Sequence, residues 1–166
     1  MISGVLVGDR ELLARLTALP AKAKARVDQT VQALGYELQA RVQRDFLTGQ
    51  VLKVRTGRLR TSITQGNPDS RSRFESTPIK AVAYVGTNVS YGRTWEYDGI
   101  PAHDIVPIKA KTLRFEIGGE VFFRKRVHIP QQGPRPFLRP ALAAFTPFAV
   151  QKLTVTLQTA VKEALK

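Results

Sequence analysis

The sequence predicts an α+β fold in which two long helices pack on a small antiparallel sheet. Apolar residues recur at helical spacing over residues 20–48 and again after residue 146, and strand-like runs lie between them, two of which flank Gly118-Gly119. Helices with one apolar face bury that face against a second layer, which the strands supply. A chain of 166 residues suits one domain, so we expect a single domain over residues 1–166.

The N-terminal quarter predicts a strand and two helices. Ile2–Val7 is a short apolar run, and Asp9 suits the cap of a short helix that follows it. A long helix over about 20–48 comes next, because its apolar residues lie three or four positions apart. These residues are Val27, Val31, Leu34, Leu38, Val42 and Phe46. Gly35 inside this helix predicts a place where another backbone segment approaches closely.

A turn, a strand, a loop and a second strand are expected after the long helix. Thr56-Gly57 reads as a tight turn, and the alternation of apolar and polar residues over 59–64 predicts a half-buried strand. Residues 65–78 collect Gly, Asn, Pro, Asp and Ser, which predicts a mobile loop. The run 79–86 is apolar on both faces towards its end, so we expect a central strand there.

The middle of the chain predicts a short helix and a hairpin. Ser90 suits the cap of a helix that closes near Gly99, with Tyr91 and Trp95 on one side of it. Strand-like runs around two glycines predict a β-hairpin over about 112–128, whose second arm we expect KRVHI to extend.

The closing helix is predicted to begin at Thr146-Pro147, a capping residue followed by a first-turn proline. Its expected buried face consists of Val150, Leu153, Leu157, Val161 and Leu165.

The charge is strongly positive, with 26 Lys and Arg against 13 Asp and Glu, a net charge of +13. Residues 50–140 hold sixteen basic and seven acidic residues and so carry most of the excess. Such a field attracts nucleic acid or an acidic protein, although it also serves solubility. The absence of cysteine excludes disulfides and thiolate metal sites. We see no signal peptide and no apolar run of membrane-spanning length, so we expect no membrane contact.

Residues with catalytic or metal-binding chemistry are sparse. His103 stands beside Asp104, and His128 is the other histidine. Glu96, Asp98 and Asp104 are the acidic residues that a cation or acid–base pair would use, but such loop carboxylates are more often solvated or paired. Nucleophile and phosphate-loop signatures are absent. We therefore expect no enzyme, no cofactor and no metal.

Four segments, taken in order, resemble one known family. Residues 55–63 (RTGRLRTSI) resemble a T-G-x-L-x-x-S-I element, 85–88 a V-G-T-N element, and 91–97 (YGRTWEY) a Y-A-x-x-x-E-x-G element. Residues 136–142 match P-F-L-R-P-A-L before a closing helix. Together they resemble the tail-completion, or head–tail joining, proteins of long-tailed phages, also called minor tail protein Z-like. Lys53 stands where that family has proline, Gly92 where it has alanine, and Asp98 is inserted before Gly99.

The resemblance implies a structural virion protein of the phage neck, assembled in the bacterial cytoplasm. It implies a ring of identical subunits, hexameric by expectation, between a head-completion, stopper or connector protein and the tail terminator or tail tube. Genomic DNA would pass through the ring without sequence-specific contacts. Candidate contacts to neighbours are Thr56, Gly57, Tyr91, Trp95, Glu96, Phe137, Leu138 and Arg139. Candidate lumen or DNA-facing residues are Arg55, Arg58 and Arg60, which would otherwise bridge to acids of the next subunit.

Several alternatives stay open at this point. Phe137 and Leu138 either anchor a neighbour or fill the chain's own core, and the core is favoured two to one, a rough weighting from how often such residues are buried. Tyr91 and Trp95 carry the same ambiguity. The chain could also be a tail terminator subunit, a free basic nucleic-acid-binding protein, or a hydrolase that uses Glu96, Asp98 and His103.

Overall fold

The structure is a computed structural model that describes residues 4–5, 21–52 and 54–164. It confirms the α+β class. The helices are α2 (Ala21–Arg41) with its π-helical last turn η1 (Val42–Phe46), α3 (Arg58–Thr61), α4 (Ser90–Arg93) with η2 (Thr94–Asp98), and α5 (Leu138–Ala164). The strands are β1 (Gly4–Val5), β2 (Arg73–Thr77), β3 (Lys80–Val85), β4 (His103–Ile105), β5 (Leu113–Ile117), β6 (Glu120–Arg124) and β7 (Val127–Ile129).

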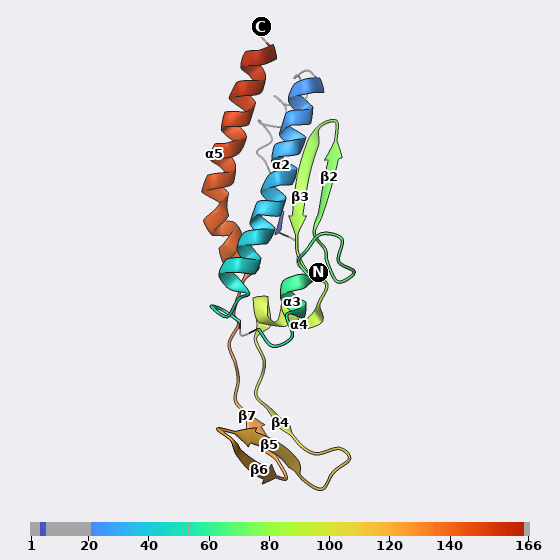
Figure 1. Ribbon diagram of the computed structural model, residues 1–166, viewed down its shortest axis with the longest axis vertical. Helices are drawn as coiled ribbons and strands as arrows, with labels where there is room; N and C mark the ends of the chain where they lie inside the picture. The colour runs from blue at the N-terminus through green and yellow to red at the C-terminus, as the bar shows by residue number, and fades with distance from the viewer. Residues whose placement is uncertain (1–3, 6–20, 53, 165–166) are drawn as a thin grey trace.

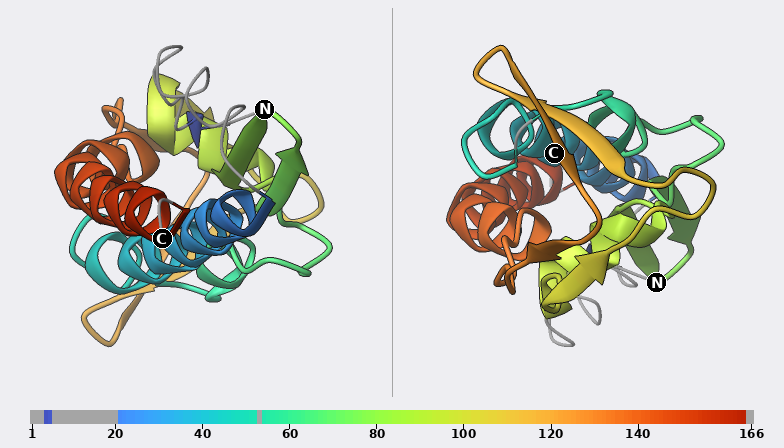
Figure 2. Two further views of the ribbon diagram at one scale, coloured as in Figure 1. Left: turned by 90° about the horizontal axis from the view of Figure 1, so that it is seen from above. Right: turned by 90° about the horizontal axis from the view of Figure 1, so that it is seen from below.

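Two long helices and a small sheet form the body of the molecule. α2 packs against α5 and against β3 (Figures 1 and 2). The sheet is antiparallel in the order β1–β3–β2, so β3 is central, as predicted. The predicted long helix is confirmed over α2 and η1, and Val27, Val31, Leu34 and Val42 on its apolar stripe are buried. β1 covers part of the predicted first strand, whereas the predicted helix after Asp9 lies outside the described residues.

Gly35 lies where α2 crosses β3, which confirms the predicted close approach. A Cβ atom added to Gly35 would lie 2.7 Å from the Cβ of Ala83, a distance that real side chains do not adopt. Glycine therefore lowers the stability of the helix at this position, but it allows the helix to pack directly on the central strand.

The start of the closing helix was predicted wrongly. α5 begins at Leu138 and continues through Pro147, and Thr146 Oγ1 donates to the carbonyl of Leu142 rather than capping a helix. The buried face is also different, because the earlier start adds residues that were not considered. Val150 and Val161 are exposed, Leu153 and Leu157 are half-buried, and Leu165 lies outside the described residues. The described residues of α5 that are buried are Leu138, Ala141, Phe145, Ala149 and Ala160.

Two further predictions between α2 and β3 were wrong. Residues 58–61 form the short helix α3 rather than a strand, and Gly57 precedes it with φ 71°. The expected loop 65–78 contains β2, which pairs with β3 over its whole length. Ser and Thr residues in β2 are tolerated because this strand lies at the edge of the sheet, where four of its five residues are exposed.

A β-structured arm extends from one end of the body (Figure 1). It consists of two antiparallel ribbons, β4–β7 and β5–β6, joined to the body by residues 99–102 and 130–135. The predicted hairpin is confirmed, because Gly118 and Gly119 both have positive φ and connect β5 to β6. KRVHI does not extend that hairpin, since β7 pairs with β4 instead.

The arm exposes many apolar side chains. These are Ile105, Val106, Ile108, Ile117, Val121 and Phe123. Phe115 and Phe122 stack on each other with ring centroids 6.0 Å apart and are half-buried. Within the described part of the chain, no helix has the length and apolar content to cross a membrane.

Candidate functional site

The four segments singled out in the sequence meet at one junction below α2, and Glu96 lies at its centre. This carboxylate is fully buried and accepts three backbone hydrogen bonds from the start of α5. The amides of Phe137 and Leu138 donate to Oε2 at 2.8 and 3.0 Å, and the amide of Arg139 donates to Oε1 at 2.8 Å. Pro140 has no N–H, so the amide donors at this helix start are all accounted for. Glu96 therefore caps α5 from 41 residues away in sequence.

A chain of hydroxyl hydrogen bonds joins the second and first segments. The amide of Val89 donates to Thr87 Oγ1 at 3.0 Å, and Thr87 Oγ1 and Ser62 Oγ share a bond of 2.7 Å. Ser62 Oγ in turn donates to the carbonyl of Leu59 at 2.8 Å. One direction of proton donation satisfies all three bonds, so the two buried hydroxyls lock α3 to the turn that follows β3.

Apolar packing completes the junction and settles one open alternative. Phe137 and Ile63 are fully buried in a cluster that also contains Val42, Val85 and Ala141. Phe137, Leu138 and Glu96 are thus part of this chain's own core. For Phe137 and Leu138 this is the alternative that the sequence favoured, and Glu96, a further candidate contact, holds the start of α5 from within the core.

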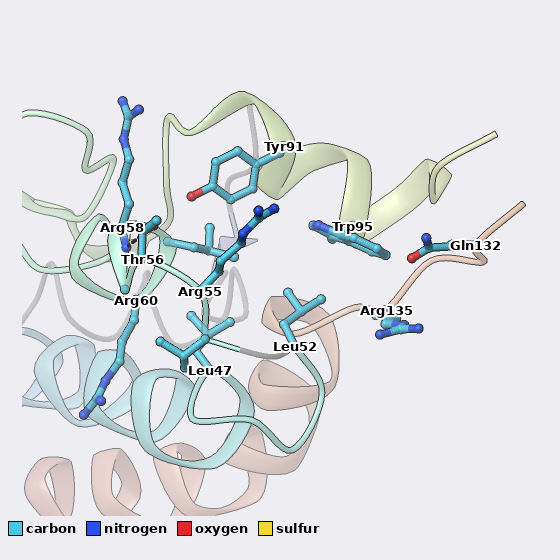
Figure 3. Close-up of a pocket in the computed structure, with 13 residues that line it drawn as sticks. Leu47, Leu52, Arg55, Thr56, Arg58, Arg60, Tyr91, Trp95, Gln132 and Arg135 are labelled. Carbon is cyan, nitrogen blue, oxygen red and sulfur yellow. Dashed lines mark hydrogen bonds between the residues drawn. The ribbon is translucent and has the colours of Figure 1, made fainter. Parts of the chain in front are cut away.

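Beside the junction lies an open groove with a cavity of about 460 Å³ (Figure 3). Its apolar lining comes from the segment that follows η1, from α3, and from α4 and η2. The apolar lining residues are Leu47, Leu52, Val54, Leu59, Tyr91 and Trp95. Polar and turn residues complete the lining, namely Arg55, Thr56, Gly57, Arg58, Arg60, Gln132 and Arg135. The predicted pairing of Tyr91 and Trp95 on one side of a helix is confirmed, because both line this groove.

The arginines around the groove are not equivalent. In Figure 3, Arg55 extends towards Tyr91 and Trp95, whereas Arg58 and Arg60 extend in opposite directions away from them. Arg58 Nε donates to Asp69 at 2.8 Å, and this bond lowers the pKa of Asp69. The Arg135 guanidinium lies 5.4 Å from the centroid of the Trp95 ring. Among the described residues, no carboxylate pairs with Arg55 or Arg135.

Arg139 leaves the junction towards solvent. Its guanidinium donates to the carbonyl of Glu96 at 2.6 Å and lies 4.7 Å from the Tyr97 ring centroid.

The start of α4 is not capped as predicted, since Ser90 lies inside that helix and Val89 precedes it without a side-chain cap.

The acidic residues considered as a metal or catalytic site have different partners in different parts of the fold. Glu96 is engaged by α5, whereas Asp104 lies on the arm and pairs with Arg126 and with His128 Nδ1 at 2.9 Å. These two hydrogen bonds lower the pKa of Asp104 to about 2. His103 Nδ1 lies 3.0 Å from the carbonyl of Pro101. In residues 4–5, 21–52 and 54–164, no group of three or more such ligands is placed to hold a metal ion.

Sequence reasoning missed several groove residues. Leu47 and Leu52 were not considered, although they follow the long helix, and Gln132 and Arg135 lie in the second connection between arm and body. In residues 135–140 (RPFLRP), the apolar pair Phe137 and Leu138 drew the prediction, and Arg135 was not predicted as a site residue. The pairing of Ile100 with Gln132 and the hydrogen bond from the Arg135 amide to the Trp95 carbonyl bring that connection to the groove, and no local sequence pattern predicts either contact.

No protein-family model, no curated protein and no solved structure matches the chain.

Proposed function

We propose that this chain is a structural subunit of the neck of a long-tailed phage, with no catalytic activity. The observation that carries the proposal is the convergence of the four family-like segments. They are spread over residues 55–142, yet the contacts of Ser62, Thr87, Glu96 and Phe137 hold them in one junction. A shared set of spaced motifs is expected when each motif supplies one part of a single packed structure.

In this proposal, identical copies form a ring, hexameric by expectation, that joins the DNA-filled head to the tail. One face of the ring meets a head-completion, stopper or connector protein, and the other meets the tail terminator or tail tube. The ring assembles in the bacterial cytoplasm and stays in the virion.

The positive charge suits a channel for DNA, because phosphate contacts carry no sequence information and allow sliding. Arg55, Arg58 and Arg60 are candidates for that lining. The pairing of Arg58 with Asp69 reduces the expected contribution of Arg58 to DNA binding, since an arginine already paired with a carboxylate attracts a phosphate more weakly.

Removal of the gene from the phage genome, followed by electron microscopy of the products, tests the proposal. We expect DNA-filled heads and separate tails of normal length, and we expect purified chain to join them. Tails of abnormal length would identify a tail terminator instead. Infectious, fully joined particles without the chain would refute the proposal.

The arginines are tested in the same assay with the triple substitution Arg55→Glu, Arg58→Glu and Arg60→Glu. We expect unjoined heads and tails, because the substitution replaces three positive charges at one subunit surface by negative ones. A control substitution, Lys162→Glu at an exposed site in the last turn of α5, lies away from the groove and should join normally. Normal joining by the triple variant would show that these arginines serve neither the ring nor the channel.

A further inference from the structure

The tip of the β5–β6 hairpin and the groove have complementary chemistry. Residues 116–121 (EIGGEV), here called the tip, place two carboxylates beside two aliphatic side chains. Ile117 is 64% exposed and Val121 is 42% exposed. The groove offers matching surfaces, namely an apolar lining for the aliphatic side chains and the positive charges of Arg55 and Arg135 for the carboxylates.

The tip's charges are available for a partner. Among the described residues, no basic group forms an ion pair with Glu116 or Glu120, just as no described carboxylate pairs with Arg55 or Arg135. The chain carries a net charge of +13, so acidic segments are scarce in it, and this tip is one of them. Such pairing of unlike charges steers one surface to another and fixes their register.

Pairing within the hairpin presents both kinds of side chain on each of its faces. Ile117 pairs with Glu120, and Glu116 pairs with Val121, and paired residues point to the same side of an antiparallel ribbon. Each face of the tip therefore carries one carboxylate and one aliphatic side chain. An apolar groove flanked by two arginines can receive such a surface in either orientation of the ribbon.

The arm's shape favours a partner copy over the chain's own groove. Figure 1 places α3 and α4, which border the groove, at the end of the body from which the arm extends. The hairpin lies beyond β4–β7, at the far end of that arm. The hairpin is thus remote from the groove of its own subunit.

We infer that the tip of one copy binds in the groove of a second copy of this chain. The contact is head-to-tail, so each copy gives one tip and receives another, and such contacts close into a ring when the rotation between copies allows it. This inference rests on the proposed ring and names the surfaces that build it. On the face of the ribbon that enters the groove, the aliphatic side chain (Ile117 or Val121) covers the apolar lining, while the carboxylate paired with it (Glu120 or Glu116) meets Arg55 or Arg135.

Charge exchange in the full-length chain tests the contact. The tip variant carries Glu116→Arg and Glu120→Arg, and the groove variant carries Arg55→Glu and Arg135→Glu. We expect each variant alone to associate at least roughly tenfold more weakly than the wild type in sedimentation velocity, because like charges then face each other. The 1:1 mixture should assemble again, since every contact in an alternating ring pairs unlike charges.

The control variant carries Glu75→Arg and Asp45→Arg, the same change in charge as the tip variant at exposed sites on β2 and at the end of α2. It should associate like the wild type, and circular dichroism should report a folded chain for every variant. Association of both variants at wild-type strength, or a mixture that stays monomeric, overturns the inference. So does a wild-type chain that remains monomeric at its highest soluble concentration.

Disulfide trapping gives a second readout, because the natural chain contains no cysteine. Chains with Val121→Cys and chains with Val54→Cys are mixed and oxidised. We expect a cross-link between the two kinds of chain in excess of either self-pairing, and the absence of that excess overturns the inference.

Failure of this inference can be distinguished from failure of the proposed function, because a chain without this contact can still be required to join heads to tails. Conversely, a cross-linked chain that phage assembly does not need would refute the neck role alone. If the groove variant loses only duplex DNA binding, the groove binds nucleic acid and not the tip.

Discussion

Replacing Glu96 by alanine should destabilise the protein more than any exposed substitution of similar size. The side chain is fully buried, and its two oxygens accept the amides of Phe137, Leu138 and Arg139 at 2.8–3.0 Å. Alanine leaves those donors without an acceptor, and it removes a negative charge from the positive end of the helix α5.

The magnitude follows from the number and kind of bonds. A hydrogen bond to a charged group contributes about 1.5–3 kcal/mol, and the three bonds share one acceptor group, so their losses do not add fully. Removing one partner from a buried charged contact costs about 3–5 kcal/mol. We expect Glu96→Ala to lower the free energy of unfolding by about 3–5 kcal/mol, equivalent to a fall in melting temperature of roughly 6–20 °C for a chain of this size.

Glu96→Gln separates the charge from the shape. The amide oxygen still accepts, but the amide nitrogen must face a backbone donor, so we expect a loss of about 1–3 kcal/mol, smaller than that of alanine. Asp98→Asn is the matched control, because this exposed carboxylate lies two residues away and forms no hydrogen bond or ion pair with α5 among the described residues.

Urea unfolding monitored by circular dichroism and by tryptophan fluorescence measures these effects. The chain has a single tryptophan, Trp95, next to Glu96, so its fluorescence reports directly on the junction. If Glu96→Ala unfolds within 0.5 kcal/mol of the control, a threshold set by the roughly ±0.5 kcal/mol usual for surface substitutions, the carboxylate does not hold the start of α5 and our account of the junction is wrong.

Three other predictions concern the helix crossing, the closing helix and the arm. Gly35→Ala should cost about 1–3 kcal/mol through its clash with Ala83, and Ala83→Gly in the same chain should recover most of that loss in urea unfolding. Pro147→Ala should raise stability by about 1–2 kcal/mol, because it restores a donor in the interior of α5, whereas Pro140→Ala in the first turn should change little. Asp104 has a pKa lowered to about 2 from 3.8, so its bonds to Arg126 and His128 stabilise the β4–β7 ribbon above about pH 4 and are lost as the pH falls through 2. NMR titration should find that midpoint, and Asp104→Asn should remove the pH dependence of the ribbon's amide signals; a midpoint near 4 would contradict the pairing.

The parts of the fold that were predicted correctly have local signals. The stripe from Val27 to Phe46 repeats for several turns, and Gly118-Gly119 supplies the positive φ values that a two-residue hairpin loop requires. Gly35 was read as a close approach because glycine inside a good helix needs a reason.

The errors share a physical cause, since a contact distant in sequence decides each element. Alternation over residues 59–64 is too short to separate a strand from a helix, and Ser62 is fixed by Thr87. The start of α5 has no local cap because Glu96 supplies it, so Thr146-Pro147 looked like the better start. The strand after Lys125 pairs with β4, which lies more than twenty residues earlier.

The candidate site was predicted in part for the same reason. Tyr91 and Trp95 lie one helical turn apart, so their common side follows from local geometry. Arg135 and Gln132 reach the groove only through the long return of the chain from the arm. Phe137 and Leu138 belong to the core because α5 starts early, and that start depends on Glu96.

Gln132 belongs to the groove and also to the root of the arm. Its backbone exchanges two hydrogen bonds of 2.8 Å with Ile100, and this pair is where the two connecting segments meet above β4–β7. Gly99 lies against the same backbone so closely that no larger residue fits there. If the tip of a second copy binds in the groove as we propose, it contacts a residue that also fixes the root of the arm. Occupation of one groove would then bias the orientation of the arm that reaches the next copy, and assembly of a ring would be cooperative.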